Sequence, residues 1–539
     1  MTGRSGVRSG LDRLAGGLHA QRWWWYGAWL IVYALGYTGL WVPIDDAGVA
    51  MVLARQKLET GSLATPLLLA EGVHPGYANA AAMAAGVLGV PHGAGPEAWD
   101  AVVRWLLALN VAAAGLWLVA THQLATWALR TPALGTAATL CCAFSALMLE
   151  NSTQTLPDTL FAAALAWWLV ALARLHRRPG KAIGAGWGRR AAWVCVACLA
   201  ATLMLGLRTV GAVVLGLGAV TGGLLLAWRV LPRLKPGSKA RGIGAPLKPG
   251  LPVLAGAGGL VLLSGLALLL VPGPTRSSVL GGVWASDVSV LLDAVTGGLR
   301  GRLTENVPRL LTRDLGEALA GSDLTAWGNA ALALAALAAA VAGIRRRPYW
   351  AVLTLGFVLI WCVFLSTTRY VLPLLPPLVV GLFDAADRLD HHRRRRRGDP
   401  QAARAPGWAG VLVLLVLLIG NLAAVVNVLG DQIQRRRGRL DAAAEAAWYG
   451  AQAVRTHRGV VGAPGAAEVS VFPGRRASAL MWWGRVWAVP RVPYKVWDQP
   501  PRTFERGQVW LELDASGAVA DADPPGPATR AAPGTPAAR

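Results

Sequence analysis

The sequence predicts an all-α polytopic membrane protein of about 11 transmembrane helices, with interfacial helices in its first outer loop and a small extracytoplasmic α/β domain near its C-terminus. Of its 539 residues, 54% are hydrophobic and 15% are charged, whereas a soluble protein carries about 25% charged residues. The apolar residues form runs long enough for a helix to cross about 30 Å of hydrocarbon. The basic residues are also spread unevenly over the connections between these runs. Together these observations disfavour a water-soluble enzyme.

The predicted spans are apolar runs, and none of them contains Asp, Glu, Lys or Arg. They lie near residues 23–41, 105–120, 133–149, 160–172, 191–207, 210–228, 251–271, 327–343, 349–365, 371–383 and 408–429. The first run is too long and too rich in tryptophan for a cleaved signal sequence, so we expect it to be retained as an anchor. All five cysteines fall within these spans, where we interpret them as small packing residues.

The positions of the charged residues predict the orientation in the membrane. With the N-terminus placed in the cytoplasm, the inner segments hold 27 basic and 5 acidic residues, and the outer segments between spans hold 10 basic and 14 acidic. Basic residues are enriched in cytoplasmic loops of membrane proteins. The net charge of +23 is therefore explained without a nucleic-acid partner, and anionic lipid is the expected neighbour of the run Arg393–Arg397.

This topology also gives the domain organisation. The segment Tyr77–Val90 is apolar but short for a crossing, so we expect an interfacial or re-entrant helix. The tail beyond residue 430 shows a helical pattern over 440–454 and strand-like runs at Glu468–Phe472 and Val509–Leu513. The predicted regions are a cytoplasmic N-terminus (1–22), a transmembrane region (23–429) with large outer loops (42–104 and 272–326), an extracytoplasmic domain (430–523) and a disordered end (524–539).

Two adjacent carboxylates, Asp45 and Asp46, lie a few residues beyond the first span. Neighbouring carboxylates repel each other and need solvent, a cation or a hydrogen-bond donor. Capping of a helix that starts near Ala47 explains one of them and leaves the other. We expect at least one to act as a general base toward an acceptor hydroxyl, and binding of a divalent cation by the pair is left open.

Charged residues at the predicted outer ends of later spans supply the complementary groups. Arg208 separates two apolar runs, and Arg369 stands within Thr-Thr-Arg-Tyr-Val-Leu-Pro. Snorkelling to the interface is one explanation, but arginine on the outer face runs against the charge bias, and its planar fork suits a phosphate. Asp158, in Leu-Pro-Asp-Thr, is either a helix cap or a functional carboxylate.

The order of these motifs resembles the GT-C class of membrane glycosyltransferases over roughly residues 23–383. The acidic pair, a His-Pro-Gly-Tyr segment before a short apolar helix, Asp158 at the start of the fourth span, Arg208-Thr and Arg369-Tyr-Val-Leu-Pro-Leu-Leu-Pro all fit this order. The similar families are protein O-mannosyltransferases, the lipid A aminoarabinose transferase and mycobacterial arabinofuranosyltransferases. The Asp-Asp-Ala opening is most similar to the last group.

The resemblance implies an inverting transferase of a bacterial cytoplasmic membrane. The donor would be a polyprenyl-phosphate sugar drawn from the membrane lipid, and the acceptor an extracytoplasmic glycan, lipid or protein. Asp45 or Asp46 would be the base. The candidate ligands of the donor phosphate are Arg208, Arg369, Arg55 and Lys57, and the candidate substrate contacts are Asp158, His74, Tyr77 and Tyr370. The first loop reads His74-Pro-Gly-Tyr77 where relatives commonly have Tyr-Pro-Pro, which favours a packing role for His74.

Three other functions remain open on the sequence alone. A secondary transporter predicts ionisable residues near the membrane centre and broken helices. A non-catalytic scaffold or polysaccharide-export protein leaves the aspartate pair and the outer arginines without a role. A transferase that uses a pyrophosphate-linked donor stays within the enzyme class.

Overall fold

The structure is a computed structural model, and it describes most of the chain between residues 16 and 434 together with four strands beyond it. The described residues are 16–36, 45–61, 75–92, 96–176, 186–208, 211, 214–218, 221, 299–321, 325–343, 348–363, 368–396, 408–434, 468–473, 494–496, 508–513 and 519–523. The predicted helix over 440–454 lies outside them, as do the predicted span over 251–271 and most of that over 210–228.

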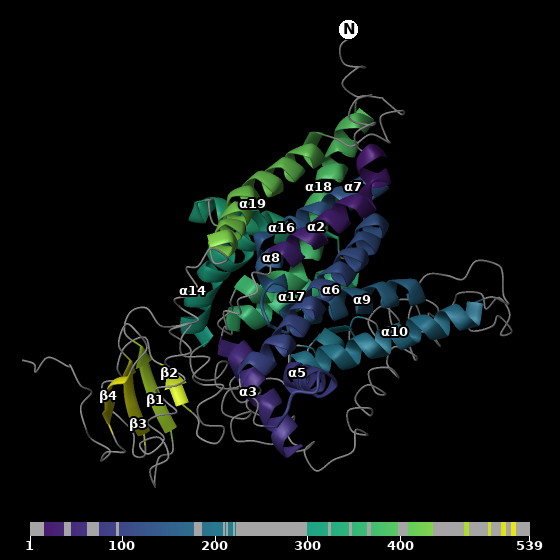
Figure 1. Cartoon of the computed structure of the whole chain (residues 1–539). Helices are drawn as coiled ribbons and strands as arrows, with labels where there is room; N and C mark the ends of the chain where they lie inside the picture. Colours follow the sequence, from purple (N-terminus) through teal and green to yellow (C-terminus); the bar gives the residue numbers. More distant parts are fainter. Residues whose placement is uncertain are drawn as a thin grey trace, which may run out of the picture.

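Apolar helices form the body of the molecule (Figure 1). Five segments of the described chain are long and apolar enough to cross a membrane. They lie in α6 (Pro96–Ala128), α9 (Asp158–His176), α10 (Gly186–Leu207), η3 (Thr368–Leu374) continued by α18 (Leu375–Arg396), and α19 (Trp408–Gln434). Shorter apolar helices are α2 (Arg22–Gly36), α16 (Ala326–Ala342) and α17 (Pro348–Val363). All of these helices coincide with predicted spans. The total of about eleven transmembrane helices stays a prediction.

One predicted span is broken. The sequence predicts a continuous helix over 133–149, but the structure has α7 (Pro132–Ala143) and α8 (Ala146–Ser152), bent by 58° at the break. The backbone N–H of Ala146 donates to Asn421 Oδ1 at 3.3 Å, and Ser145 Oγ donates to the carbonyl of Ala318 at 3.4 Å. Distant elements therefore supply hydrogen-bond partners for the polar groups at the bend. The local sequence does not reveal these partners.

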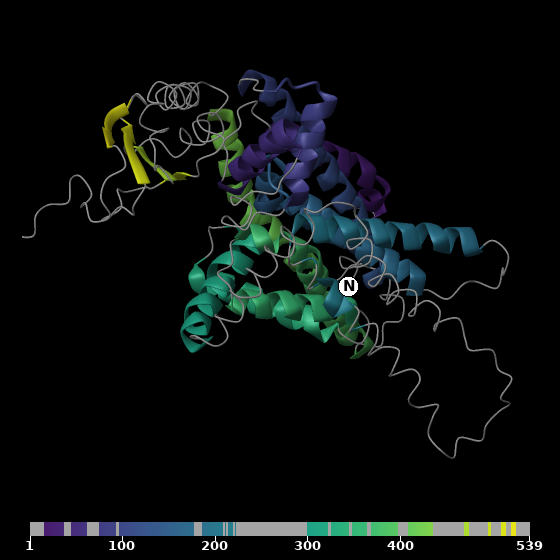
Figure 2. The same cartoon turned by 90° about the horizontal axis from the view of Figure 1, so that it is seen from below.

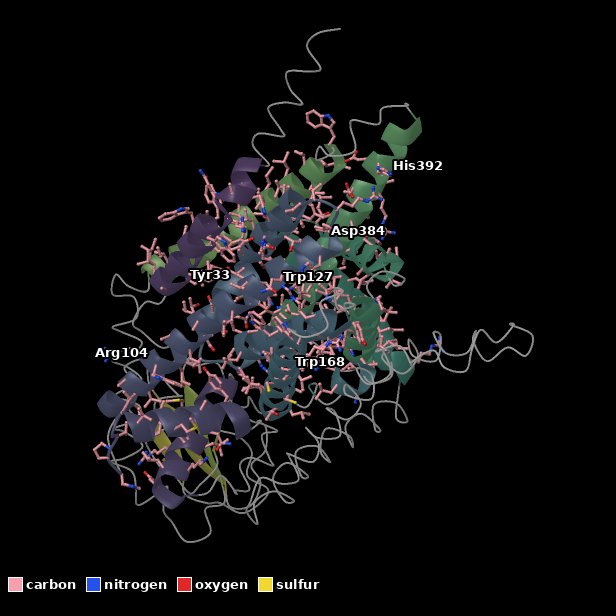
Figure 3. All side chains as sticks on the ribbon, turned by 90° about the vertical axis from the view of Figure 1, so that its right-hand side faces the viewer. Tyr33, Arg104, Trp127, Trp168, Asp384 and His392 are labelled. Atoms are coloured by element: carbon pink, nitrogen blue, oxygen red, sulfur yellow. The ribbon has the colours of Figure 1, made fainter. Side chains whose placement is uncertain are left out.

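The helices of the first outer loop gather at one end of the bundle. There α3 (Asp45–Thr60) packs against α5 (Pro75–Val87), and α5 packs against α6 and α10. The labelled His392 on α18 lies at the opposite end (Figure 3). We call the end with α3 and α5 the predicted outer end. The first outer loop and the end of α18 thus lie at opposite ends, as the predicted topology requires. Which of these ends faces the outside of the cell stays a prediction.

The helices of the third outer segment and the two short apolar helices form a second group. They are α14 (Leu299–Arg309), the π-helix η2 (Leu310–Leu315), α15 (Gly316–Ala320), α16 and α17. Figure 2 shows this teal and green group on a different side of the molecule from the purple helices α2 and α3. In this group η2 packs against α16 and also against η3. It thereby supports η3, which carries two of the predicted site residues.

The tail contributes a four-stranded sheet with the order β2-β1-β3-β4. The strands are β1 (Glu468–Pro473), β2 (Tyr494–Val496), β3 (Gln508–Leu513) and β4 (Val519–Asp523). Strand β1 pairs in parallel with β2 and β3, and β4 pairs antiparallel with β3. Strands β1 and β3 coincide with the two strand-like runs predicted from the sequence, whereas β2 and β4 were not expected. The extracytoplasmic domain as a whole stays a prediction.

Candidate active site

The predicted outer residues Asp158 and Arg208 come together because α9 and α10 are antiparallel neighbours. Asp158 is the first residue of α9, and Arg208 follows the last residue of α10. A short connection between two helices favours this antiparallel arrangement, and it brings the start of the first helix beside the end of the second. Figure 1 shows the two helices side by side. One helical hairpin thus brings together two residues that are fifty positions apart in the sequence.

Asp158 and Arg208 form a largely buried ion pair. The Arg208 Nη2 atom donates to Asp158 Oδ1 at 2.7 Å, with side-chain exposures of 18% for the arginine and 6% for the aspartate. A buried charge persists only when it is paired or hydrogen-bonded. The other oxygen of Asp158, Oδ2, is also buried and has no hydrogen-bond partner among the described residues. The ion pair therefore joins the start of α9 to the end of α10 through one oxygen of Asp158.

Tyr370 brings a second guanidinium group to the same place. Arg208 Nη1 donates to the Tyr370 hydroxyl oxygen at 3.3 Å, and Arg369 Nη2 donates to the same oxygen at 3.2 Å. The two guanidinium carbons also lie 4.7 Å and 5.1 Å from the centre of the Tyr370 ring. The face of an aromatic ring attracts cations, so the ring offsets part of the repulsion between the arginines. Two guanidinium groups around one tyrosine give a positively charged, partly buried site.

The start of η3 is held in place by Asp314, a residue that the sequence analysis did not single out. Asp314 lies in the π-helix η2 and is fully buried. Its Oδ1 accepts a hydrogen bond from Thr368 Oγ1 at 3.2 Å, and its Oδ2 lies 4.0 Å from Arg309 Nε. Single π-helical turns are frequent at functional sites. Because Thr368 precedes Arg369 and Tyr370 directly, this contact helps to fix both side chains.

A second missed residue, Asn110, fixes the loop that leads to Asp158. Asn110 is fully buried in α6, and its Nδ2 donates to the carbonyls of Gln154 and Leu156 at 2.5 Å and 3.1 Å. These carbonyls stand in the turn directly before α9, so their position determines where Asp158 begins the helix. A lone amide within an otherwise apolar span was the available signal in the sequence, since such residues need partners in the membrane.

Tyr77 approaches the site from α5. A Cβ atom added to the preceding Gly76 would lie 2.2 Å from the carbonyl oxygen of Gly206, so only glycine lets α5 and α10 come this close. Tyr77 is buried, beside the Asn110 side chain and within electrostatic reach of Asp158. Burial raises the pKa of the Tyr77 hydroxyl far above its ordinary value, which keeps the hydroxyl neutral.

Only some of the candidate residues of the first outer loop have side chains that the structure describes. Asp45 and Asp46 form the first turn of α3, where the helix dipole favours carboxylates, but their side chains lie outside the described ones, and so does His74. Arg55 pairs with Glu59 at 2.8 Å, and Lys57 donates to Asn79 of α5. Four predicted site residues therefore form a chain of contacts, from Asp158 to Arg208, from Arg208 to Tyr370 and from Tyr370 to Arg369. The catalytic role of the aspartate pair and the phosphate role of Arg55 and Lys57 stay predictions.

A metal site receives no direct support from the described residues. Within them, no three His, Cys, Asp or Glu side chains come close enough to hold a metal ion. The carboxylates of Asp45 and Asp46, the pair considered for a divalent cation, are outside that set. The site that the structure does describe is built from guanidinium, phenol, amide and carboxylate groups.

Comparison with solved structures identifies the fold. Among the most similar is the oligosaccharyltransferase of Archaeoglobus fulgidus tethered to an acceptor peptide, with a TM-score of 0.51 and 12% identity over 87% of this chain. This chain covers 64% of that protein's length. ArnT from Cupriavidus metallidurans bound to undecaprenyl phosphate gives a TM-score of 0.43 and 12% identity, over 91% of this chain and 93% of that one. No protein-family model matches the sequence, and neither does any curated protein.

At this level of identity the similarity to the oligosaccharyltransferase concerns the fold alone. The chain is mostly helical, with several apolar helices that are long enough to cross a membrane, and its fold is similar to that of the oligosaccharyltransferase. The TM-score to ArnT is too low to support an argument. Substrate, stereochemistry and catalytic residues therefore depend on the site itself, because one fold hosts many functions.

Proposed function

We propose that this protein is an integral-membrane glycosyltransferase that moves a sugar from a polyprenyl-phosphate donor to an acceptor on the extracytoplasmic face. The main observation behind this proposal is that Arg208 and Arg369 both donate hydrogen bonds to Tyr370, and that Arg208 also pairs with Asp158. Guanidinium groups bind phosphate through paired, charge-assisted hydrogen bonds. A site of this kind at the end of apolar helices suits a phosphate that is attached to a membrane lipid.

The fold of the solved Archaeoglobus neighbour is compatible with this proposal. That protein is an oligosaccharyltransferase and was captured with a tethered acceptor peptide. We propose an acceptor for this chain as well, and we propose the lipid-phosphate donor from the two arginines of the site. The sugar and the acceptor class are not specified by these similarities.

The proposed reaction is a single inverting displacement. The acceptor hydroxyl oxygen attacks the anomeric carbon from the face opposite the phosphate, while Asp45 or Asp46 takes its proton. The bond from the anomeric carbon to the phosphate oxygen breaks, and its electron pair leaves with the polyprenyl phosphate. Arg208 and Arg369 stabilise the negative charge that grows on this oxygen, which is where preorganised charge lowers the barrier most.

A secondary transporter is the alternative function to compare, because transporters contain broken helices and α7 and α8 form one here. In this chain the groups at the break are bound by protein: Ala146 by Asn421, and Ser145 by the Ala318 carbonyl. The break is therefore a packed joint between α7, α8, α15 and α19. We favour the transferase because the clustered cations lie at one end of the helices, beside α5.

Release of polyprenyl phosphate from synthetic polyprenyl-phosphate mannose or arabinofuranose, with purified protein and a panel of acceptors, tests the proposal. We expect Asp45→Asn or Asp46→Asn to abolish release without lowering the unfolding temperature. Glu150→Gln is the matched control, since Glu150 is an exposed carboxylate of the second predicted outer segment that accepts a hydrogen bond from Gln154. Full turnover in both aspartate variants would remove the pair from the mechanism.

A further inference from the structure

An arginine and three tryptophans gather at the end of α9 that is remote from Asp158. We define the Arg174 cluster as Arg174 and Trp167 of α9, Trp127 of α6 and Trp193 of α10. The chain order explains the gathering: α6 and α9 both end here, and α10, which is antiparallel to α9, begins here. These three helices are among the segments long and apolar enough to cross a membrane. The cluster therefore lies where apolar helices meet the headgroups of one leaflet.

The guanidinium group of Arg174 is held by side chains from two neighbouring helices. Its central carbon lies 4.4 Å from the centre of the Trp127 ring and 5.6 Å from that of the Trp193 ring. Its Nη2 atom donates to Gln123 Oε1 at 3.4 Å. The Trp193 ring in turn stacks on Trp167, with ring centres 6.5 Å apart and planes inclined by 15°. The cation therefore has a defined position on an aromatic surface.

This cation is accessible, and its surroundings are strongly basic. Arg174 is exposed, whereas the three indole rings are partly buried against the core. All five N–H bonds of a guanidinium lie in its own plane, so a ring stacked on the flat face covers none of them. Residues 174–190 contain six basic and no acidic residues. The cluster thus presents an oriented, positively charged group beside an apolar aromatic surface.

The chemistry of the cluster selects an anionic phospholipid. The planar fork of arginine suits a phosphate, and basic segments next to apolar helices attract anionic lipids. A choline headgroup would also bring a quaternary ammonium, which aromatic rings bind, but Arg174 already lies over the Trp127 ring and would repel that second cation. A free phosphate has no acyl chains and gains nothing from the indole rings. A phospholipid with a net negative charge uses both the cation and the aromatic surface.

We propose that the Arg174 cluster binds one anionic phospholipid of the leaflet on the opposite side from Asp158. The lipid phosphate accepts hydrogen bonds from Arg174, and the acyl chains lie against Trp167 and Trp193. The site is separate from the residues proposed to hold the donor phosphate, since Arg208 lies at the opposite end of α10. Lipid binding here does not require the proposed glycosyltransferase function, because it depends only on charge, on aromatic geometry and on the position of the cluster at the ends of apolar helices.

Native mass spectrometry of the purified protein, with phosphatidylglycerol and phosphatidylcholine of identical acyl chains, tests the site. We expect Arg174→Gln to weaken the tightest phosphatidylglycerol binding about fivefold, the contribution of one arginine near anionic lipid, and to leave phosphatidylcholine binding unchanged. Arg174→Lys keeps the charge and loses the planar fork, so it should also bind phosphatidylglycerol more weakly than the wild type. Arg104→Gln is the matched control, since Arg104 is exposed at the other end of α6 from Trp127 (Figure 3). We expect this control to bind both lipids as the wild type does.

Each contrary result would overturn the site. Unchanged phosphatidylglycerol binding in Arg174→Gln would show that Arg174 does not contact the lipid. An equal loss for both lipids would show that the variant disturbs helix packing, and an equal loss in Arg104→Gln would show attraction to net charge without a defined site. Wild-type affinity in Arg174→Lys would show that the stacked planar group is not needed. Displacement of the lipid by inorganic phosphate, but not by chloride of equal ionic strength, would identify a free anion as the ligand.

Discussion

Removal of the Arg208 side chain separates the structural role of the Asp158–Arg208 pair from its role in binding. Arg208→Ala leaves the Asp158 carboxylate, which is 6% exposed, without its cation. Breaking a buried ion pair from one side costs about 3–5 kcal/mol, and because Arg208 is 18% exposed we expect the lower end, about 3 kcal/mol. Asp158→Asn leaves a guanidinium that still meets some solvent and an amide oxygen, so its cost should be about 1–2 kcal/mol.

The double variant Arg208→Ala/Asp158→Asn contains neither charge. We therefore expect it to be more stable than Arg208→Ala alone, because no uncompensated carboxylate remains buried. Its affinity for polyprenyl phosphate should stay low, since the phosphate ligand is still missing; the loss of a charge-assisted hydrogen bond corresponds to at least about tenfold. Thermal unfolding in detergent measures the first quantity, and lipid-phosphate binding to the same samples measures the second.

Two results would refute this reasoning. Recovery of lipid binding together with stability in the double variant would show that Arg208 acts only through the fold. Unchanged stability in Arg208→Ala would show that the pair does not form. Arg130→Ala/Asp387→Asn is the control. This pair is 3.4 Å apart, and Asp387 stands on α18 between Asp384 and His392, both labelled in Figure 3. Loss of the pair should leave lipid binding unchanged.

Three further predictions concern the supports of the site. Tyr370→Phe removes the oxygen that both arginines share and keeps the ring, so we expect polyprenyl-phosphate binding to weaken by about 1–2 kcal/mol, roughly tenfold, in an equilibrium binding assay; wild-type affinity would show that the phenol oxygen is not needed. Gly76→Ala places a Cβ 2.2 Å from the Gly206 oxygen, and forcing the helices apart should cost about 1–3 kcal/mol. Gly86→Ala in the same helix meets nothing within 4 Å and should leave the unfolding temperature unchanged, so equal behaviour of the two variants would contradict the close contact. Asn110→Ala leaves the carbonyls of Gln154 and Leu156 without a donor and should lower stability by about 2–3 kcal/mol and slow transfer, measured by thermal unfolding and by donor turnover; a fully stable variant would show that the turn before α9 holds itself.

Most of the transmembrane pattern is present in the sequence because a helix in lipid must satisfy its backbone internally and cover itself with apolar side chains. The described apolar helices accordingly coincide with predicted spans. Arg208 and Arg369 were also recognisable, since each interrupts apolar sequence at a predicted helix end. The strands β1 and β3 were recognisable as strand-like runs in the tail.

The failures have specific causes. The break between α7 and α8 depends on Asn421 and Ala318, which are remote in the sequence. Asp314 looked like an ordinary loop acid, and its importance arises from Thr368 in another element. Asn110 looked like a single polar residue in a span, and its two carbonyl partners lie more than 40 residues away.

What the sequence determined by itself is therefore everything governed by contact with lipid and water: the apolar helices, their charged ends and the candidates for chemistry. Only the tertiary structure decided which of those candidates meet. Arg208 reaches Asp158 because α9 and α10 are antiparallel, and it shares Tyr370 with Arg369 because η2 and Asp314 hold η3 against the bundle. Hydropathy acts on each residue separately, whereas an ion pair or a hydrogen bond depends on the positions of two groups, and those positions exist only once the helices have packed.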